Sequence, residues 1–202
     1  MNHPCFTHLR RQIDTAITWN DLDDARRRIA EGLRLAQEKE CPGELMYFRA
    51  QAAIVDGHFA EALDSLGRAL AFNPRDGAAY NDIALCLVEQ GRIDGVIEIF
   101  DKGIAVEPDY ATIHHNKGWF LNKIGRPSAA LVCFEQALAL EPRRVVTWEN
   151  MANACEELGR VPEALGAYRN ALAFFDGPAT GIREQLQAEI ARLELKESGK
   201  GS

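Results

Sequence analysis

Adjacent carboxylates are the residues of this chain whose type most readily suggests catalysis. They occur as Asp23-Asp24 and Glu156-Glu157. Acid–base cleavage of a glycosidic bond needs two carboxylates that face each other across a cleft, with the pKa of one of them raised. Sequence neighbours on an exposed helix do not supply that arrangement, so solvated helix faces explain them better. The sequence also lacks the Gly-x-Ser-x-Gly, His-Glu-x-x-His and phosphate-loop patterns, and we expect no catalytic residue.

Histidines and cysteines are the remaining candidates for metal chemistry. His114 and His115 are adjacent, so on a helix their side chains point about 100° apart and form a poor pair of ligands. A disulfide framework or a zinc site needs closely spaced cysteines, which this chain lacks. We therefore expect neither a metal nor a cofactor. The cysteines are Cys5, Cys41, Cys86, Cys133 and Cys155. The last three fall in helical stretches, and we interpret them as small buried hydrophobic residues.

The composition excludes several classes of partner. The net charge is −7, and no basic stripe is present to displace counterions from phosphates, so we expect no nucleic acid. No stretch of about 18 apolar residues occurs, so we expect no membrane span. The first residues lack the apolar core of a secretion signal. Cysteines without close partners fit a reducing compartment, and we expect a cytoplasmic protein.

Glycine and proline recur at a step of 34 residues, which indicates the elements that position every side chain. A fixed period near this length is typical of stacked helix-turn-helix units. Glycine suits the left-handed residue that ends a first helix, and proline cannot continue a second one. The recurring residues are Gly57, Gly91, Gly125 and Gly159, with Pro74, Pro108 and Pro142.

Four copies of the 34-residue unit begin at Gly43, Gly77, Ala111 and Val145. We number the places of each copy from its first residue, and the copies agree at many of these places. Small residues at place eight let two helix backbones approach, and large residues at place twenty-four fill the gap between them. Place eight holds Ala50, Ala84, Gly118 and Ala152, and place twenty-four holds Leu66, Phe100, Phe134 and Tyr168. The pattern resembles the tetratricopeptide repeat, a family of paired antiparallel helices. The resemblance implies an all-α fold, a right-handed α-solenoid of stacked helix pairs.

The two ends of the array depart from the repeat. The first segment has apolar residues at helical spacing but no glycine at place fifteen, so it is either a degenerate fifth repeat or a plain capping hairpin. The last segment carries Ile182, Leu186, Ile190 and Leu193 on one face of an amphipathic helix, which we expect to cap the final repeat; docking to another subunit is the alternative. The expected divisions are a hairpin over 6–42, repeats over 43–76, 77–110, 111–144 and 145–178, a capping helix over 179–196 and a disordered tail over 197–202.

In the family that this chain resembles, the first helix of each unit lines a concave groove that binds a partner. Trp119 is a bulky ring that the repeat's own packing does not require, so it is either a binding anchor or a partly covered surface residue. We expect His114 to pack at place four and His115 to face the groove. Asn116 and Asn150 match a ladder of asparagines that holds a peptide backbone in some relatives, although asparagine there also has structural reasons. The groove positions are Tyr47, Phe48, Gln51, Asn81, Leu85, Val88, His115, Asn116, Trp119, Asn122, Asn150 and Asn153.

These observations predict a non-enzymatic adaptor that binds a peptide or helix of a partner protein in its concave groove. Glutamates fall on or near the concave groove. Lysine and arginine are missing from the places that hold acidic peptides in related co-chaperones. An acidic partner would therefore meet like charge, and we expect a neutral or basic segment. The alternative is a self-assembling scaffold, a homo-oligomer whose groove takes a terminal segment of another copy.

Overall fold

The computed structural model describes residues 4–176 and 180–198, and within those ranges it contains eleven α-helices and no strand. The all-α prediction is confirmed. The chain divides into two compact units, Met1–Glu107 and Pro108–Ser202, so the division falls near the boundary between the second and third 34-residue copies. Each unit is a stack of helix pairs, as in an α-solenoid.

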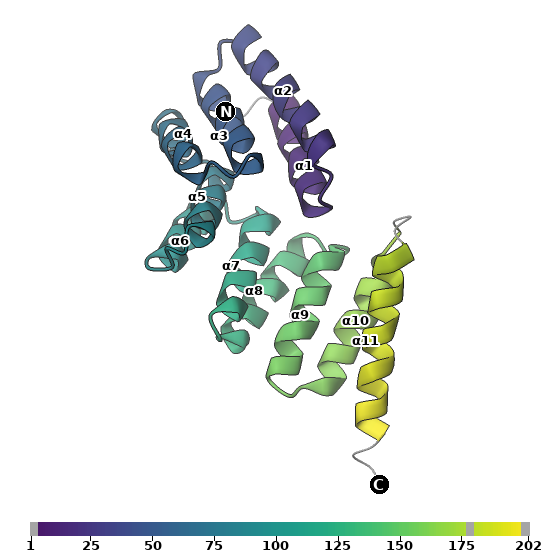
Figure 1. The fold of residues 1–202 in the computed structure, drawn as a ribbon. Coiled ribbons are helices and arrows are strands. Elements are labelled where there is room, and N and C mark those ends of the chain that lie inside the picture. The colour runs from purple at the N-terminus through teal and green to yellow at the C-terminus, as the bar shows by residue number, and fades with distance from the viewer. Residues whose placement is uncertain (1–3, 177–179, 199–202) are drawn as a thin grey trace. The chain divides into compact units, whose positions relative to one another are not determined.

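Unit 1 contains six helices, each packed against the next one in chain order (Figure 1). The second helix is long, and its start is capped by Asp21, whose side chain accepts a hydrogen bond from the Asp24 N–H at 3.0 Å. The helices are α1 (Pro4–Thr18), α2 (Leu22–Glu38), α3 (Pro42–Val55), α4 (Phe59–Phe72), α5 (Gly77–Glu89) and α6 (Val96–Val106).

Unit 2 contains five helices, and again each packs against the next (Figure 1). The first helices of its two repeats, α7 and α9, also contact each other directly. Side chains on these two helices therefore share one surface. The helices are α7 (Ala111–Lys123), α8 (Pro127–Leu140), α9 (Val145–Glu157), α10 (Val161–Phe174) and α11 (Thr180–Ser198).

The repeating pattern of small and large residues builds the core of both units. The four residues at place twenty-four are buried, and Leu66, Phe100 and Phe134 have no exposed surface. Ala50, Ala84 and Ala152 at place eight have no exposed surface, because a neighbouring helix lies directly against them. The glycines at place fifteen take the predicted left-handed conformation, with φ between 70° and 76°.

The second repeat departs from its neighbours in one respect that the period did not predict. Its second helix, α6, begins at Val96, whereas the second helices of the other full repeats begin three places earlier in the copy. The cause is Gly95, which has φ of 76° and so cannot continue an α-helix toward its N-terminus. The lost turn leaves Ile93 exposed at the loop.

The last helix, α11, packs against α10 and buries Leu186 and Leu193. It continues to Ser198, so the expectation of a disordered tail was wrong for Glu197 and Ser198, which complete the final helical turn. The remaining tail positions, 199–202, lie outside the described residues, as do residues 177–179 at the end of the fourth copy.

Candidate functional site

The groove positions of unit 1 are largely occupied by the unit's own side chains. Arg10 of α1 lies over the ring of Tyr47, with 3.5 Å between the guanidinium carbon and the ring centroid. It also donates hydrogen bonds to Glu44 at 3.1 Å and to both carboxylate oxygens of Asp76 at 3.0 and 2.9 Å. Burial alone would lower the pKa of Arg10, but Tyr47, Asp76 and Glu44 raise it above its ordinary value. A permanently charged arginine therefore covers this part of the predicted groove.

Asp82 on α5 is the centre of a second cluster in the same unit. Its carboxylate accepts hydrogen bonds from the side-chain amides of Gln51 at 2.5 Å and Asn81 at 3.0 Å, and from the Tyr47 hydroxyl. The pKa of Asp82 is raised to about 7. Burial is the largest cause of the rise, the hydrogen bonds from Asn81 and Tyr47 oppose it, and Asp14 and Asp76 add to it. Three neutral donors thus hold a carboxylate that titrates near neutral pH.

The burial of these residues corrects the sequence prediction for unit 1. Phe48 has no exposed surface and packs against Phe6, with ring centroids 5.9 Å apart, so it is a core residue and not part of a partner surface. Tyr47, Gln51 and Asn81 are at most 5% exposed because they serve the two clusters. Of the unit 1 positions, only Leu85 keeps intermediate exposure, and Val88 is buried.

His115 in unit 2 also differs from its prediction. It is 6% exposed, and its Nδ1 lies 2.9 Å from the hydroxyl of Thr147 on the neighbouring first helix. Burial and, to a smaller extent, the charge of Arg144 together lower the pKa of His115 to about 3, so the imidazole is neutral at physiological pH. His115 therefore joins α7 to α9. His114 packs as predicted, with Nε2 2.8 Å from the Pro108 carbonyl oxygen.

The remaining positions of unit 2 stay accessible on one surface, which we call the α7–α9 face. Trp119 is partly exposed, and the Lys123 ammonium lies 4.8 Å from its ring centroid. Asn122 donates to Glu157 at 3.1 Å, and this bond links the two helices. The face consists of Asn116, Trp119 and Asn122 on α7 with Glu149, Asn150 and Asn153 on α9, all of them partly or fully exposed.

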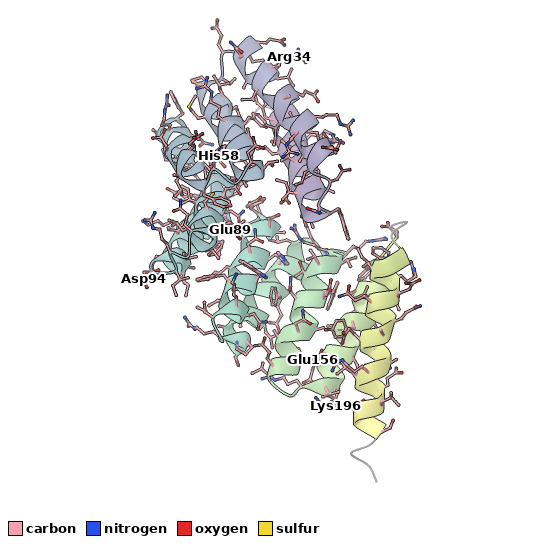
Figure 2. All side chains as sticks on the ribbon, viewed as in Figure 1. Arg34, His58, Glu89, Asp94, Glu156 and Lys196 are labelled. Carbon is pink, nitrogen blue, oxygen red and sulfur yellow. The ribbon has the colours of Figure 1, made fainter. Side chains whose placement is uncertain are left out.

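Carboxylates give the α7–α9 face its charge. Glu156 is neutralised by Arg192 of α11, at 2.6 and 2.8 Å, and Figure 2 labels Glu156 on the side of α9 toward α11. The pKa of Glu149 is raised by burial and by the nearby Glu189, and no cation among the described residues offsets the rise. A partly desolvated carboxylate of this kind is stabilised by any cation brought to it.

Sequence reasoning missed Arg10, the residue that covers unit 1. One signal was available: Arg10 and Glu44 are separated by 34 residues, one period of the array. Equivalent places in successive units lie side by side in stacked repeats, so an arginine and a glutamate at that spacing form an ion pair. No comparable spacing rule indicates Asp76, which lies 66 residues from Arg10.

Neither metal binding nor membrane insertion receives support from the described part of the chain. Within it, no group of three histidine, cysteine or acidic side chains is placed to hold a metal ion. The helices found between residues 4 and 198 are all too short or too polar to cross a bilayer.

The chain consists of helix pairs that repeat every 34 residues, and adjacent first helices expose side chains. This arrangement defines a class of repeat that binds other proteins. Two sequence profiles, both described as tetratricopeptide repeat, match residues 53–116 and residues 115–178. Together they cover more than half of the chain, which belongs to the tetratricopeptide repeat family. No curated protein sequence matches it closely enough to count as a relative.

Solved structures share the fold. The thermophilic TPR protein TTC0263 of Thermus thermophilus is 23% identical, with a TM-score of 0.68 over 94% of this chain and 99% of that one. A MamA fragment from Desulfovibrio magneticus RS-1 is 17% identical, with a TM-score of 0.66 over 78% of this chain and 86% of that one. YrrB, described as a TPR protein with an unusual peptide-binding site, is 15% identical, with a TM-score of 0.59 over 87% and 88%.

Proposed function

We propose that this chain is a non-enzymatic interaction module that binds a neutral or basic segment of a partner protein on the α7–α9 face. One observation carries the proposal: Trp119 and four asparagines stay accessible on two adjacent first helices, while all the predicted groove positions of unit 1 except Leu85 are buried. A rigid aromatic ring supplies contact area, and amide side chains supply both donors and acceptors for an extended backbone.

The charge of the α7–α9 face supports a neutral or basic partner. Lys123 is engaged with the Trp119 ring and Arg192 with Glu156, so these two cations are already used. Glu149 is the carboxylate that an incoming lysine or arginine would neutralise. An acidic segment would instead place like charges together in a partly desolvated setting. The peptide-binding site named for YrrB, a protein of the same fold, is consistent with this use.

A random peptide library provides a test that does not depend on knowing the partner. Peptides of about twelve residues displayed on phage are selected on the full chain, and the recovered sequences are then measured by fluorescence anisotropy. We expect lysine and arginine to be enriched over aspartate and glutamate. We expect the Trp119→Ala/Asn150→Ala double variant to weaken binding by at least about tenfold, since removal of an anchor ring typically costs about 2 kcal/mol or more.

The matched control is Val132→Ala/Gln136→Ala, which removes one apolar and one amide side chain from the exposed part of α8. It should bind the peptides as the unchanged chain does. Glu149→Gln should weaken basic peptides while leaving neutral ones unaffected. Equal binding by all variants, or enrichment of acidic peptides, would overturn the proposal. Light scattering of the unliganded chain across a concentration series tests self-association, which the alternative scaffold role requires.

A further inference from the structure

Aspartate followed by glycine is a sequence in which the main chain can react with a side chain. The nitrogen of the second residue lies close to the carboxyl carbon of the first, so a five-membered ring closes at a high effective concentration. Glycine also has no side chain to crowd the attack. The described residues contain three such pairs, Asp56-Gly57, Asp76-Gly77 and Asp94-Gly95. A fourth pair, Asp176-Gly177, extends beyond the described residues.

The pair Asp76-Gly77 is restrained at both reacting groups. The Gly77 N–H donates a hydrogen bond to Glu107 at 3.0 Å. The Asp76 carboxylate is 3% exposed, and it accepts hydrogen bonds from the Ala79 N–H at 3.1 Å and from Arg10 at 3.0 and 2.9 Å. Because the nitrogen and the carboxylate are both engaged, ring closure at this pair requires local opening of the structure.

The pair Asp56-Gly57 at the end of α3 is restrained in the same two ways, although less strongly. The Gly57 N–H donates to the Ile54 carbonyl oxygen at 3.0 Å, and Arg26 donates to the Asp56 carboxylate at 3.3 Å. Both ends of the ion pair are half-exposed, so the restraint on the carboxylate is weak. The hydrogen bond on the nitrogen still has to break before the nitrogen can attack.

The pair Asp94-Gly95, in the loop between α5 and α6, has neither restraint. Both residues are exposed, and Figure 2 labels Asp94. Within the described ranges, the Gly95 N–H donates no hydrogen bond and the Asp94 carboxylate forms no ion pair. Gly95 has φ of 76° and ψ of 1°, while φ of Asp94 is not positive, so the two residues form the centre of a type II turn.

We propose that Asp94-Gly95 is a site of spontaneous aspartate isomerisation, whose product loosens the start of α6. The Gly95 nitrogen bonds to the side-chain carboxyl carbon of Asp94, and the carboxyl hydroxyl leaves as water with the proton from the nitrogen. Water then adds to the resulting succinimide. Attack at the main-chain carbonyl breaks the original peptide bond and yields isoaspartate, whereas attack at the side-chain carbonyl restores aspartate. The two steps release and consume one water molecule, and nothing is oxidised or reduced.

The consequence for α6 follows from the length of the main chain. Isoaspartate adds one carbon to the main chain, and the negative charge is kept because the freed α-carboxylate replaces the side-chain carboxylate. The Val96 N–H donates to the Ile93 carbonyl oxygen at 3.5 Å, and the Ile99 N–H donates to the Gly95 carbonyl oxygen at 3.2 Å. The Val96 side chain has no exposed surface. A longer chain cannot keep this turn closed and Val96 in its place together, so the first turn of α6 should open.

Peptide mapping of the full chain after several weeks at neutral pH and physiological temperature tests the site. Isoaspartyl peptides keep their mass but change retention, and electron-transfer fragmentation identifies the position. We expect isoaspartate to accumulate fastest at residue 94, at least about tenfold faster than at residue 76, because residue 76 reacts only after local opening. The chain denatured in urea is the control, and there the three pairs should react at similar rates. The proposal concerns the α5–α6 loop and does not depend on the function proposed for the α7–α9 face.

The variant Asp94→Glu keeps the carboxylate but would need a six-membered ring, so isomerisation at this position should be lost. Hydrogen exchange compares the purified isomerised chain with the fresh chain, and we expect amides in the first turn of α6 to lose at least about tenfold of their protection. Accumulation at residue 94 that is no faster than at residues 56 and 76 in the folded chain would overturn the proposal. Unchanged protection of α6 in the isomerised chain would overturn the consequence drawn for that helix.

Discussion

Replacing Gly32 by alanine tests whether Phe48 is a core residue. A Cβ atom on Gly32 would lie 2.5 to 2.8 Å from three ring atoms of Phe48, well inside contact distance. The ring cannot move aside easily, because it is fully buried and packs against Phe6 and Tyr47. Overpacking of this kind costs about 1–3 kcal/mol, while alanine is favoured over glycine inside a helix by about 1 kcal/mol. The net change in the free energy of unfolding is a loss of about 0–2 kcal/mol.

Gly67→Ala is the matched control, because Gly67 also lies inside a helix of unit 1 but would place its Cβ in open space. That variant should gain about 0.5–1 kcal/mol from helix propensity alone. The difference between the two variants cancels the propensity and isolates the overpacking, so it should be about 1–3 kcal/mol. Urea titrations followed by circular dichroism give both values. If Gly32→Ala proved as stable as Gly67→Ala, the packing described for Phe48 would be refuted.

Two further predictions concern buried charge. Arg10→Met should destabilise unit 1 by about 3 kcal/mol, because the Asp76 carboxylate is only 3% exposed and would lose its cation. Urea titration at pH 7 measures the free energy of unfolding. An unchanged free energy of unfolding would contradict the ion pair. His115 stays neutral when folded because burial holds its pKa near 3, whereas the unfolded residue takes up a proton below about pH 6.5. Unit 2 should therefore lose about 2 kcal/mol between pH 7 and pH 5, measured as smaller hydrogen-exchange protection factors in α7; unchanged protection factors would contradict the burial of His115.

The 34-residue period was sufficient to predict the helix pairs, because the residues that set the period also set the packing. Glycine at place fifteen requires a left-handed backbone, and the small residues at place eight require a close helix contact. The period did not predict the late start of α6. A single glycine at position 95, outside the places that the copies share, moved that helix start by three residues.

The candidate site was harder to predict, since helical spacing fixes which way a side chain points but not what covers it. Phe48 and His115 occupy groove positions by spacing, yet both are buried. Phe48 packs against Phe6 of the preceding hairpin, and His115 lies against Thr147 of the next repeat. The side chain over Tyr47 is Arg10, which lies in the degenerate first hairpin, outside the four full copies. Trp119 was predicted as accessible, and it remains partly exposed, with the Lys123 ammonium against its ring.

The most direct test of the account is hydrogen exchange of the full chain with and without a peptide selected from the random library. Binding on the α7–α9 face predicts added protection in α7 and α9 at residues 111–123 and 145–157, with the exposed face of α8 unchanged. Protection confined to α8, to α11 or to unit 1 would show that the partner binds elsewhere and would contradict the central claim.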